Sequence, residues 1–288
     1  MKRILVPVDF SDHTVNTCKY ALEIAKKYGS EITLFHAYND QLFVSSPSMP
    51  DAYDINPYSN AELAEDIKND VQILINKLSV ELMNILINEN VKNVKIKTHI
   101  SEGDLEYDLK QFCDDYHPSI IVIGTRGKGN SSNAFGVKAI HIINNVNWPV
   151  LAIPVSSKYK DLKNIMYTTI FEQNEDVLIR KLFNKFEAFE AKIHCVHIWG
   201  DEDYLKDEVK LEELKETFSV EVASGNFICD ILENEDYHKG IQEYITKNNI
   251  DLIAFVPHKA KLFQRLFGQN NPDKELFNIN LPLFSMRE

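Results

Sequence analysis

The sequence predicts an α/β protein made of two tandem domains, each with a five-stranded parallel sheet. Apolar runs rich in β-branched residues alternate with segments of helical periodicity, which is typical of parallel strands covered by helices on both faces. A glycine-rich loop follows one of these runs, and the order of segments in the first half recurs in the second. Because a repeated order of elements indicates a repeated fold, we expect two copies of one α/β unit in the 288 residues.

The first half alternates between expected strands and helices. The strands are predicted over residues 3–8, 31–37, 94–100, 119–123 and 150–153. A first helix would begin at a cap of Ser11 or Asp12 and end at Gly29. A second helix is predicted from an apolar stripe at Ile67, Val71, Leu74, Leu78, Leu82 and Ile85, and a third covers 105–116. Residues 39–60 hold three prolines and predict a long loop that overhangs the crevice at the carboxyl ends of the strands.

The second half repeats the first at a constant offset. Residues 4–9 correspond to 165–170, and residues 35–40 correspond to 196–201, both 161 positions later. The repeat predicts three segments: a domain over 1–155, a polar linker over 156–164 and a second domain over 165–288.

The second copy has lost the chemistry of the first. Ile170 stands where Asp9 stands in the first copy, and Pro257, which has no N–H to offer a phosphate, falls within the segment that replaces the glycine loop. We therefore predict a degenerate second domain. Its charged helix over 204–218 is interpreted as having a solvated acidic face. The basic and aromatic segment 259–267 is open to two interpretations, an anion or partner groove and a helix making core or dimer contacts.

The loop that starts at Gly124 reads Gly-Thr-Arg-Gly-Lys-Gly and follows a buried strand. Glycines let the backbone approach a ligand, and free N–H groups at the start of the next helix attract an anion. Many strand-to-helix turns need glycine without binding anything, so the loop alone leaves both a phosphate site and a plain turn open. Arg126 and Lys128 are open in the same way, between phosphate neutralisation and simple exposure.

Together, the strand that ends in Asp9 and the Gly124-x-x-Gly127 loop resemble the universal stress protein family. The resemblance implies the HUP fold of adenine-nucleotide-binding proteins, with the Asp contacting adenine and the loop binding the phosphates of ATP. The family pattern places nine residues between the second and third glycines, followed by Ser or Thr. Here eight residues separate Gly127 from Gly136, and Val137 removes the hydroxyl donor. The resemblance assigns the nucleotide site to Pro7, Val8, Asp9, Ala37, Gly124, Arg126, Gly127, Gly136, Val137 and Lys138.

Asp9 has two interpretations, a helix-capping carboxylate and an acceptor for the adenine amino group, and the family match favours the second. His36 and His197 occupy equivalent positions in the two copies, so we interpret both as hydrogen-bonded core imidazoles. His194 and His197 suggest a metal site, but residues three apart on a strand point to opposite faces, so no metal site is predicted.

No Ser-His-Asp or Cys-His set and no general base near the loop are recognisable, so no catalytic residue is predicted.

The composition bounds the partners and the compartment. A net charge of −12 argues against a nucleic-acid partner, because phosphate backbones are held by clustered Lys and Arg. The absence of 18 consecutive apolar residues and of a signal-like N-terminus predicts a cytoplasmic protein without a membrane partner. The four cysteines are far apart in the sequence, so reduced thiols are expected, without a disulfide or zinc site.

The resemblance implies a stress-responsive sensor or scaffold in which an adenine nucleotide, with Mg²⁺, changes a surface read by a protein partner. Two alternatives stay open, a slow ATPase and a nucleotide-free interaction scaffold.

Each copy ends in an apolar strand, over 150–153 and 281–284. Exposed apolar edges invite pairing, so we expect the two halves to pair along these strands, an arrangement that is also compatible with a homodimer.

Overall fold

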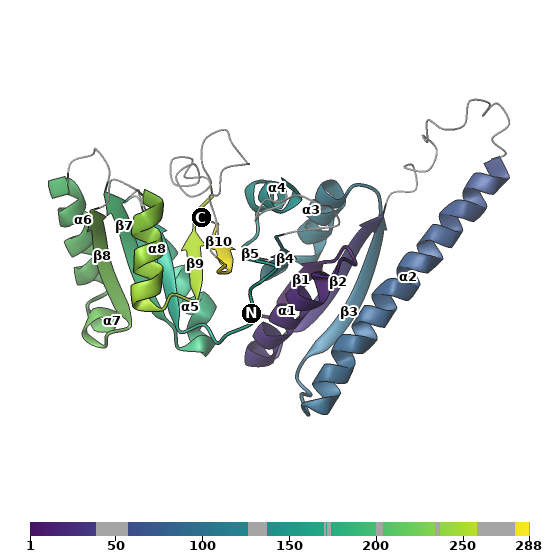
Figure 1. Ribbon diagram of the computed structural model, residues 1–288, viewed down its shortest axis with the longest axis horizontal. Helices are drawn as coiled ribbons and strands as arrows, with labels where there is room; N and C mark the ends of the chain where they lie inside the picture. Colours follow the sequence, from purple (N-terminus) through teal and green to yellow (C-terminus); the bar gives the residue numbers. More distant parts are fainter. Residues whose placement is uncertain are drawn as a thin grey trace. The chain divides into compact units, whose positions relative to one another are not determined.

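The computed structural model describes residues 1–38, 57–125, 137–169, 171, 174–199, 204–233, 237–257 and 280–287. The protein is an α/β molecule with mostly parallel strands, which confirms the predicted fold class. It divides into two compact units, Met1–Ile123 and Gly124–Glu288 (Figure 1). Within the described residues, no helix has the length and apolar character needed to cross a bilayer.

The first unit is a parallel sheet with the strand order β3-β2-β1-β4. Its strands are β1 (Arg3–Pro7), β2 (Glu31–Tyr38), β3 (Lys95–Glu102) and β4 (Ile120–Gly124). Its helices are α1 (Thr14–Tyr28), α2 (Pro57–Asn88) and α3 (Leu105–Tyr116). In the sheet, Ile4 of β1 lies opposite Ile32 of β2 and Ile120 of β4, and all three are fully buried. Helices therefore cover both faces of β1, as its unbroken apolar run predicts.

The ends of α1 show which residues control the helix. The predicted cap at Ser11 or Asp12 is wrong, because the N-cap residue is His13 and its side chain makes no capping hydrogen bond. The carboxylate of Asp9 reaches over from the preceding turn instead and accepts from the Thr14 hydroxyl at 2.8 Å. The predicted end at Gly29 is confirmed: Gly29 is left-handed, with a φ of 62°, and its N–H bonds to the carbonyl oxygen of Ala25.

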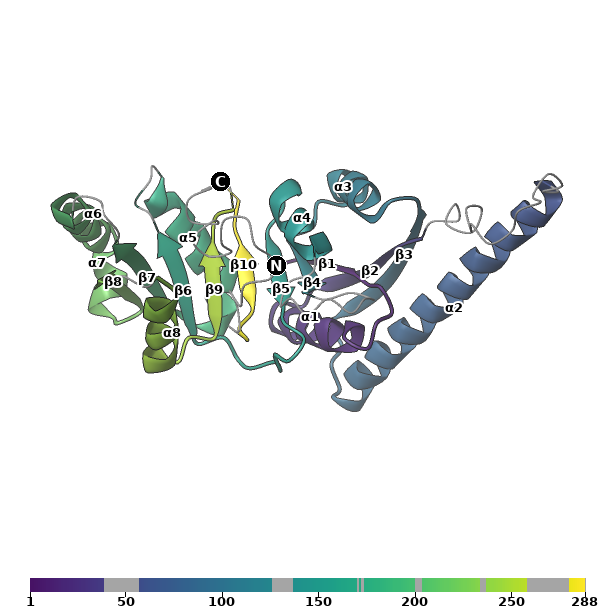
Figure 2. The same cartoon turned by 45° about the horizontal axis from the view of Figure 1, so that its top comes forward.

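Helix α2 begins at Pro57, inside the predicted loop, while residues 39–56 lie outside the described residues. It packs against β2, β3 and α1 (Figure 2). The buried residues of its apolar stripe are Val71, Ile75, Leu78, Leu82 and Leu86. Predicted stripe residue Leu74 is 43% exposed. Leu74 and its neighbour Ile75 are both apolar, and side chains one position apart on a helix differ by about 100° in direction. The apolar pattern alone therefore did not show that Ile75, rather than Leu74, lies on the buried face.

The second unit has the strand order β5-β10-β9-β6-β7-β8. Its strands are β5 (Val150–Ile153), β6 (Asn164–Thr169), β7 (Lys192–Trp199), β8 (Phe227–Glu233), β9 (Leu252–Phe255) and β10 (Leu283–Ser285). Its helices are α4 (Val137–Asn145), α5 (Glu175–Phe186), α6 (Tyr204–Thr217), α7 (Ser219–Ala223) and α8 (Tyr237–Asn248), with a single 3-10 turn, η2 (Glu187–Phe189), after α5. The described strand pairs of this unit are parallel except for β5 and β10, which run antiparallel.

Strand β10 joins the last residues of the chain to β5. Phe284 lies opposite Leu151 on one side and Ala254 of β9 on the other, and it is 1% exposed. Pro282 cannot donate to the ladder, but its carbonyl oxygen accepts from the N–H of Ile253 at 3.1 Å. The compact units divide before Gly124, so β5 and β10 belong to the same unit. The predicted domains, 1–155 and 165–288, describe the sequence repeat and stay a prediction.

Helix α6 confirms the predicted solvated acidic face except at one position. Glu208, Glu212, Glu213 and Glu216 are exposed, whereas Asp207 is 6% exposed. The buried face is completed by Leu211 and Leu214, which follow Asp207 at helical spacing. The segment 259–267 lies outside the described residues.

Candidate functional site

The turn after β1 is built around the Asp9 carboxylate. Its Oδ1 accepts from the backbone N–H of Ser11 at 3.1 Å and from the Thr14 hydroxyl at 2.8 Å. Between them, Phe10 adopts a left-handed φ of 53°, which folds the chain back from the strand into α1. These contacts tie Asp9 to the turn that precedes α1, and they hold the carboxylate in one orientation at the carboxyl end of β1.

A histidine from the neighbouring strand closes this turn. The Nδ1 of His36 lies 2.6 Å from the carbonyl oxygen of Val8, and because a carbonyl only accepts, Nδ1 carries the proton. The ring of Phe10 packs on the ring of His36 with a centroid distance of 4.5 Å. His36 thus fixes the backbone next to Asp9.

The second unit contains the same turn without the aspartate. Phe171 also has a φ of 53°, its ring packs on His197 at 4.6 Å, and the Nδ1 of His197 donates to the carbonyl oxygen of Thr169 at 3.0 Å. The Thr169 hydroxyl accepts from the N–H of Phe171 at 2.9 Å, so a side-chain oxygen one position earlier than the counterpart of Asp9 holds this turn. The structural interpretation of both histidines is confirmed, and Ile170 lies outside the described residues.

The other predicted site residues of the first unit lie at the ends of β1 and β2. Pro7 is opposite Phe35 in the register, and the N–H of Val8 donates to the carbonyl oxygen of Phe35 at 2.8 Å. Ala37 is half-buried one residue beyond His36 and lies opposite Ser101 of β3. The sheet therefore brings Val8, Asp9 and Ala37 to the carboxyl ends of adjacent strands, where α/β sheets hold ligands.

The remaining predicted residues belong to the loop after β4 and to α4. Gly124 is the last residue of β4, and Val137 and Lys138 are the first two residues of α4. Arg126, Gly127 and Gly136 lie outside the described residues, so the loop geometry stays a prediction.

Thr125 is a site residue that sequence reasoning missed. Its N–H donates to the carbonyl oxygen of Ile153 at 3.0 Å, and its side chain is 1% exposed. Its hydroxyl has no hydrogen-bond partner among the described residues, although a buried hydroxyl normally has one. The sequence signal was the residue type itself, a hydroxyl at the start of a loop predicted to bind phosphate.

Buried polar groups also occur on both faces of β7. His194 Nδ1 lies 3.0 Å from the hydroxyl of Tyr244 on α8, and that hydroxyl donates to Asp230 at 2.5 Å. On the other face, His197 Nε2 lies 3.0 Å from Asp207 of α6. The predicted opposite orientation of the two histidines is confirmed. Burial lowers the pKa of His194, partly offset by the charge of Asp230, and burial raises the pKa of Tyr244.

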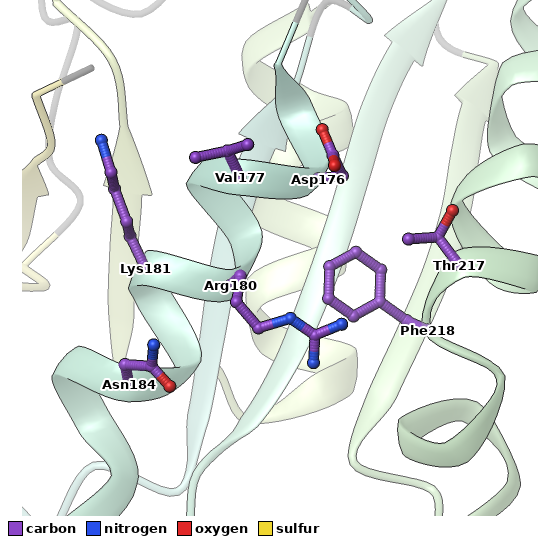
Figure 3. Close-up of a pocket in the computed structure, with 7 residues that line it drawn as sticks. All are labelled: Asp176, Val177, Arg180, Lys181, Asn184, Thr217 and Phe218. Carbon is purple, nitrogen blue, oxygen red and sulfur yellow. The ribbon is translucent and has the colours of Figure 1, made fainter.

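Two pockets lie on the second unit, and neither contains a predicted site residue. A pocket of about 260 Å³ lies between α5 and the C-terminal end of α6; Figure 3 shows Arg180 extending from α5 toward Phe218. The Arg180 guanidinium sits 4.5 Å from the centre of that ring and pairs with Glu221 at 2.7 Å, so its charge is already matched. The neighbouring pocket of about 350 Å³ is lined in part by Phe171, Glu175 and Lys210. Among the described residues, no group of three His, Cys, Asp or Glu side chains could hold a metal ion.

The parallel strands bring an oriented carboxylate to their carboxyl ends, and a glycine-rich segment follows β4. This is the arrangement of open α/β proteins, a class in which ligand sites lie at this edge of the sheet. A family model described as "Universal stress protein family" matches residues 1–154, which is more than half of the chain. The chain therefore belongs to the universal stress protein family, and the resemblance seen in the sequence is confirmed.

Individual relatives agree with this membership. A universal stress protein of Methanocaldococcus jannaschii is 27% identical over 158 residues, which cover 54% of this chain and 84% of that protein. The crystal structure of a universal stress protein from Archaeoglobus fulgidus matches 99% of this chain and 96% of its own, with a TM-score of 0.66 and 15% identity. A proposed universal stress protein from Pseudomonas aeruginosa matches 100% of this chain and 93% of its own, with a TM-score of 0.58 and 12% identity. The two structural matches show that the fold is shared over the whole chain.

Proposed function

We propose that this universal stress protein binds one adenine nucleotide through its N-terminal half and acts as a stress-responsive binding protein or scaffold rather than an enzyme. The oriented carboxylate of Asp9 carries the proposal. Two donors, Ser11 N–H and the Thr14 hydroxyl, fix its Oδ1 before any ligand arrives. A carboxylate oxygen is the acceptor that the adenine amino group requires, and an acceptor already held in place lowers the ordering cost of binding.

The glycine loop would take the phosphates, with Mg²⁺ as their counterion. This part of the proposal rests on the family pattern, and the chain departs from that pattern at Val137 and in the length of the loop. Inserting one residue between Lys128 and Phe135, together with Val137→Ser, restores both features. We expect the repaired chain to bind ATP more tightly, because a phosphate oxygen gains a donor at the start of α4. Equal affinity of the repaired and natural chains would show that phosphate is bound elsewhere.

The decisive experiment separates the two roles of Asp9. In Asp9→Asn the amide oxygen keeps accepting from Ser11 and Thr14, while a donor replaces the second carboxylate oxygen. We expect this variant to fold normally and to bind ATP about tenfold to a hundredfold more weakly in calorimetric titrations, as for a lost hydrogen bond to a charged group. Its affinity for inosine triphosphate, which offers an acceptor at the same ring position, should rise. Asp12→Asn is the matched control, because Asp12 is exposed and carries the same charge.

The same titration tests the alternatives. One nucleotide per chain is expected, because the second half lacks both an aspartate equivalent to Asp9 and the glycine loop. Two nucleotides per chain would show that the second half is not degenerate. If ATP does not bind at all, the chain works as a nucleotide-free scaffold, and release of phosphate from bound ATP would favour the slow ATPase. Unchanged ATP affinity in Asp9→Asn contradicts the role given to Asp9.

We also propose that the two sequence repeats associate within one chain through β5 and β10. The antiparallel register of Leu283 with Ala152 and of Ser285 with Val150 supports this arrangement. Light scattering should then give the mass of one chain, and a concentration-dependent doubling of mass would indicate further pairing into a homodimer. A cytoplasmic location is proposed as well, supported by four free cysteines.

A further inference from the structure

The second unit brings two cysteines together that are 34 positions apart in the sequence. Cys195 of β7 and Cys229 of β8 lie directly opposite each other in the parallel register. Neighbouring strands are about 4.8 Å apart, which lies inside the roughly 4.4–6.8 Å between Cα atoms that a disulfide bridges. Directly opposed residues on paired strands also point their side chains to the same face of the sheet.

The two thiols differ in a way that suits two successive roles. Cys195 is fully buried, whereas Cys229 is partly exposed. The hydrogen bond that the Cys195 thiol donates to Cys229, together with burial, raises the pKa of Cys195, so this thiol stays protonated.

Helix α6 places a cation in the surroundings of Cys229. Lys215 is hydrogen-bonded to Glu212 at 2.7 Å, and this bond, followed by the charges of Glu212, Cys229 and Asp230, raises the pKa of Lys215. The ammonium group therefore persists at neutral pH and interacts favourably with a thiolate on Cys229. Reactive cysteines are typically partly exposed and close to a positive charge; Cys229 is partly exposed and interacts electrostatically with Lys215.

We propose that Cys195 and Cys229 form a redox-active dithiol that a hydroperoxide converts into an intramolecular disulfide. In the first step the Cys229 thiolate attacks the distal oxygen of the hydroperoxide, the O–O bond breaks, and a proton completes the departing alcohol or water. Cys229 is then a sulfenic acid. In the second step the Cys195 sulfur attacks the Cys229 sulfur, the S–O bond breaks, and water leaves with the thiol proton of Cys195. Two thiols are thereby oxidised by two electrons, which reduce one hydroperoxide.

The other two cysteines provide an internal comparison. Cys18 and Cys113 are both buried, at 1% and 0% exposure, and burial raises the pKa of each to about 12. They lie on different helices, α1 and α3. Thiols of this kind are inert toward peroxide, so the reaction should be confined to the pair in the second unit.

The test uses hydrogen peroxide on the full chain, followed by denaturation and alkylation of the thiols that remain. We expect the natural chain to fall from four alkylated cysteines to two, to stay monomeric, and to yield one linked peptide pair containing Cys195 and Cys229. Dithiothreitol should restore all four. The variant Cys18→Ala/Cys113→Ala should fall from two alkylated cysteines to none.

Blocking the first step should block the second. In Cys229→Ser we expect all three remaining cysteines to stay alkylated at the same peroxide concentration. Several results would overturn the proposal: four alkylated thiols in the oxidised natural chain, a loss of Cys229 alone as sulfinic acid, or a disulfide between two chains. Because the natural chain gives the primary result, the conclusion does not depend on the folding of any variant.

Discussion

The buried pair of His197 and Asp207 leads to the most direct prediction about stability. His197 Nε2 lies 3.0 Å from Asp207 Oδ2, and both residues are about 5% exposed, at 5% and 6%. Oδ2 takes part in no hydrogen bond of good geometry among the described residues, so this close polar contact is not ideally aligned. The perturbation is Asp207→Ala, which leaves the buried imidazole without its carboxylate partner.

The expected loss follows from the cost of leaving a buried polar group without its partner. Removing one partner of such a contact costs roughly 1–3 kcal/mol, and we expect about 2 kcal/mol for this pair. For a unit of this size each 1 kcal/mol shifts the melting temperature by about 2–4 °C, so a fall of about 4–8 °C is expected.

Urea and thermal unfolding of the full chain measure this loss. The matched control is Glu208→Ala, which removes the same charge from the next position of α6, where the side chain is exposed. Its effect should stay within about 0.5 kcal/mol. If Asp207→Ala costs less than about 1 kcal/mol more than the control, Asp207 is not paired as described, and the account of its burial is wrong.

Two further predictions concern the backbone and the pH. Gly29→Ala places a Cβ at a φ of 62°, 3.3 Å from the Asn93 side-chain nitrogen, and should cost roughly 1–2 kcal/mol in urea unfolding. Gly225→Ala has a similar φ of 72° but open space around the Cβ, so a larger loss there than at Gly29 would contradict the steric argument. Burial lowers the pKa of His194 in the folded state, so the unfolded chain binds the proton more readily. Stability should therefore be fully present above about pH 6.5 and fall as the pH drops below it, and His194→Asn should make this acid loss smaller.

The sequence predicted the fold well, because its signals are local. Apolar runs and the offset of 161 residues fix the strands and the repeat, and Gly29 closes α1 as its residue type indicates. The equivalence of His36 and His197 was also readable, since the same residue type recurs at the same place in both copies. Each of these inferences needs only neighbouring residues or a constant shift along the chain.

The interactions that were not predicted depend on distant parts of the chain. The spacing of Asp207 from Leu211 and Leu214 places it on the apolar face of α6, but its contact with His197 depends on where β7 lies, which the sequence of α6 does not indicate. Cys195 and Cys229 are neighbours because of the register of β7 and β8. Distance along the sequence gives no indication that these two thiols lie side by side. The contacts of Asp9 with Ser11 and Thr14 required the left-handed turn at Phe10, which residue type alone does not indicate.

The pairing of β5 with β10 has a consequence for the synthesis of the chain. Strand β5 ends at Ile153, and β10 begins only at Leu283, about 130 residues later. At roughly 5–20 residues per second, a ribosome needs about 7–26 s to make the intervening segment. During that interval the first repeat can fold, but the apolar edge of β5 has no native neighbour on this side. Another nascent chain on the same messenger RNA, whose β10 has already emerged from its ribosome, could pair with this edge first. The product would then be an exchanged dimer instead of a closed monomer.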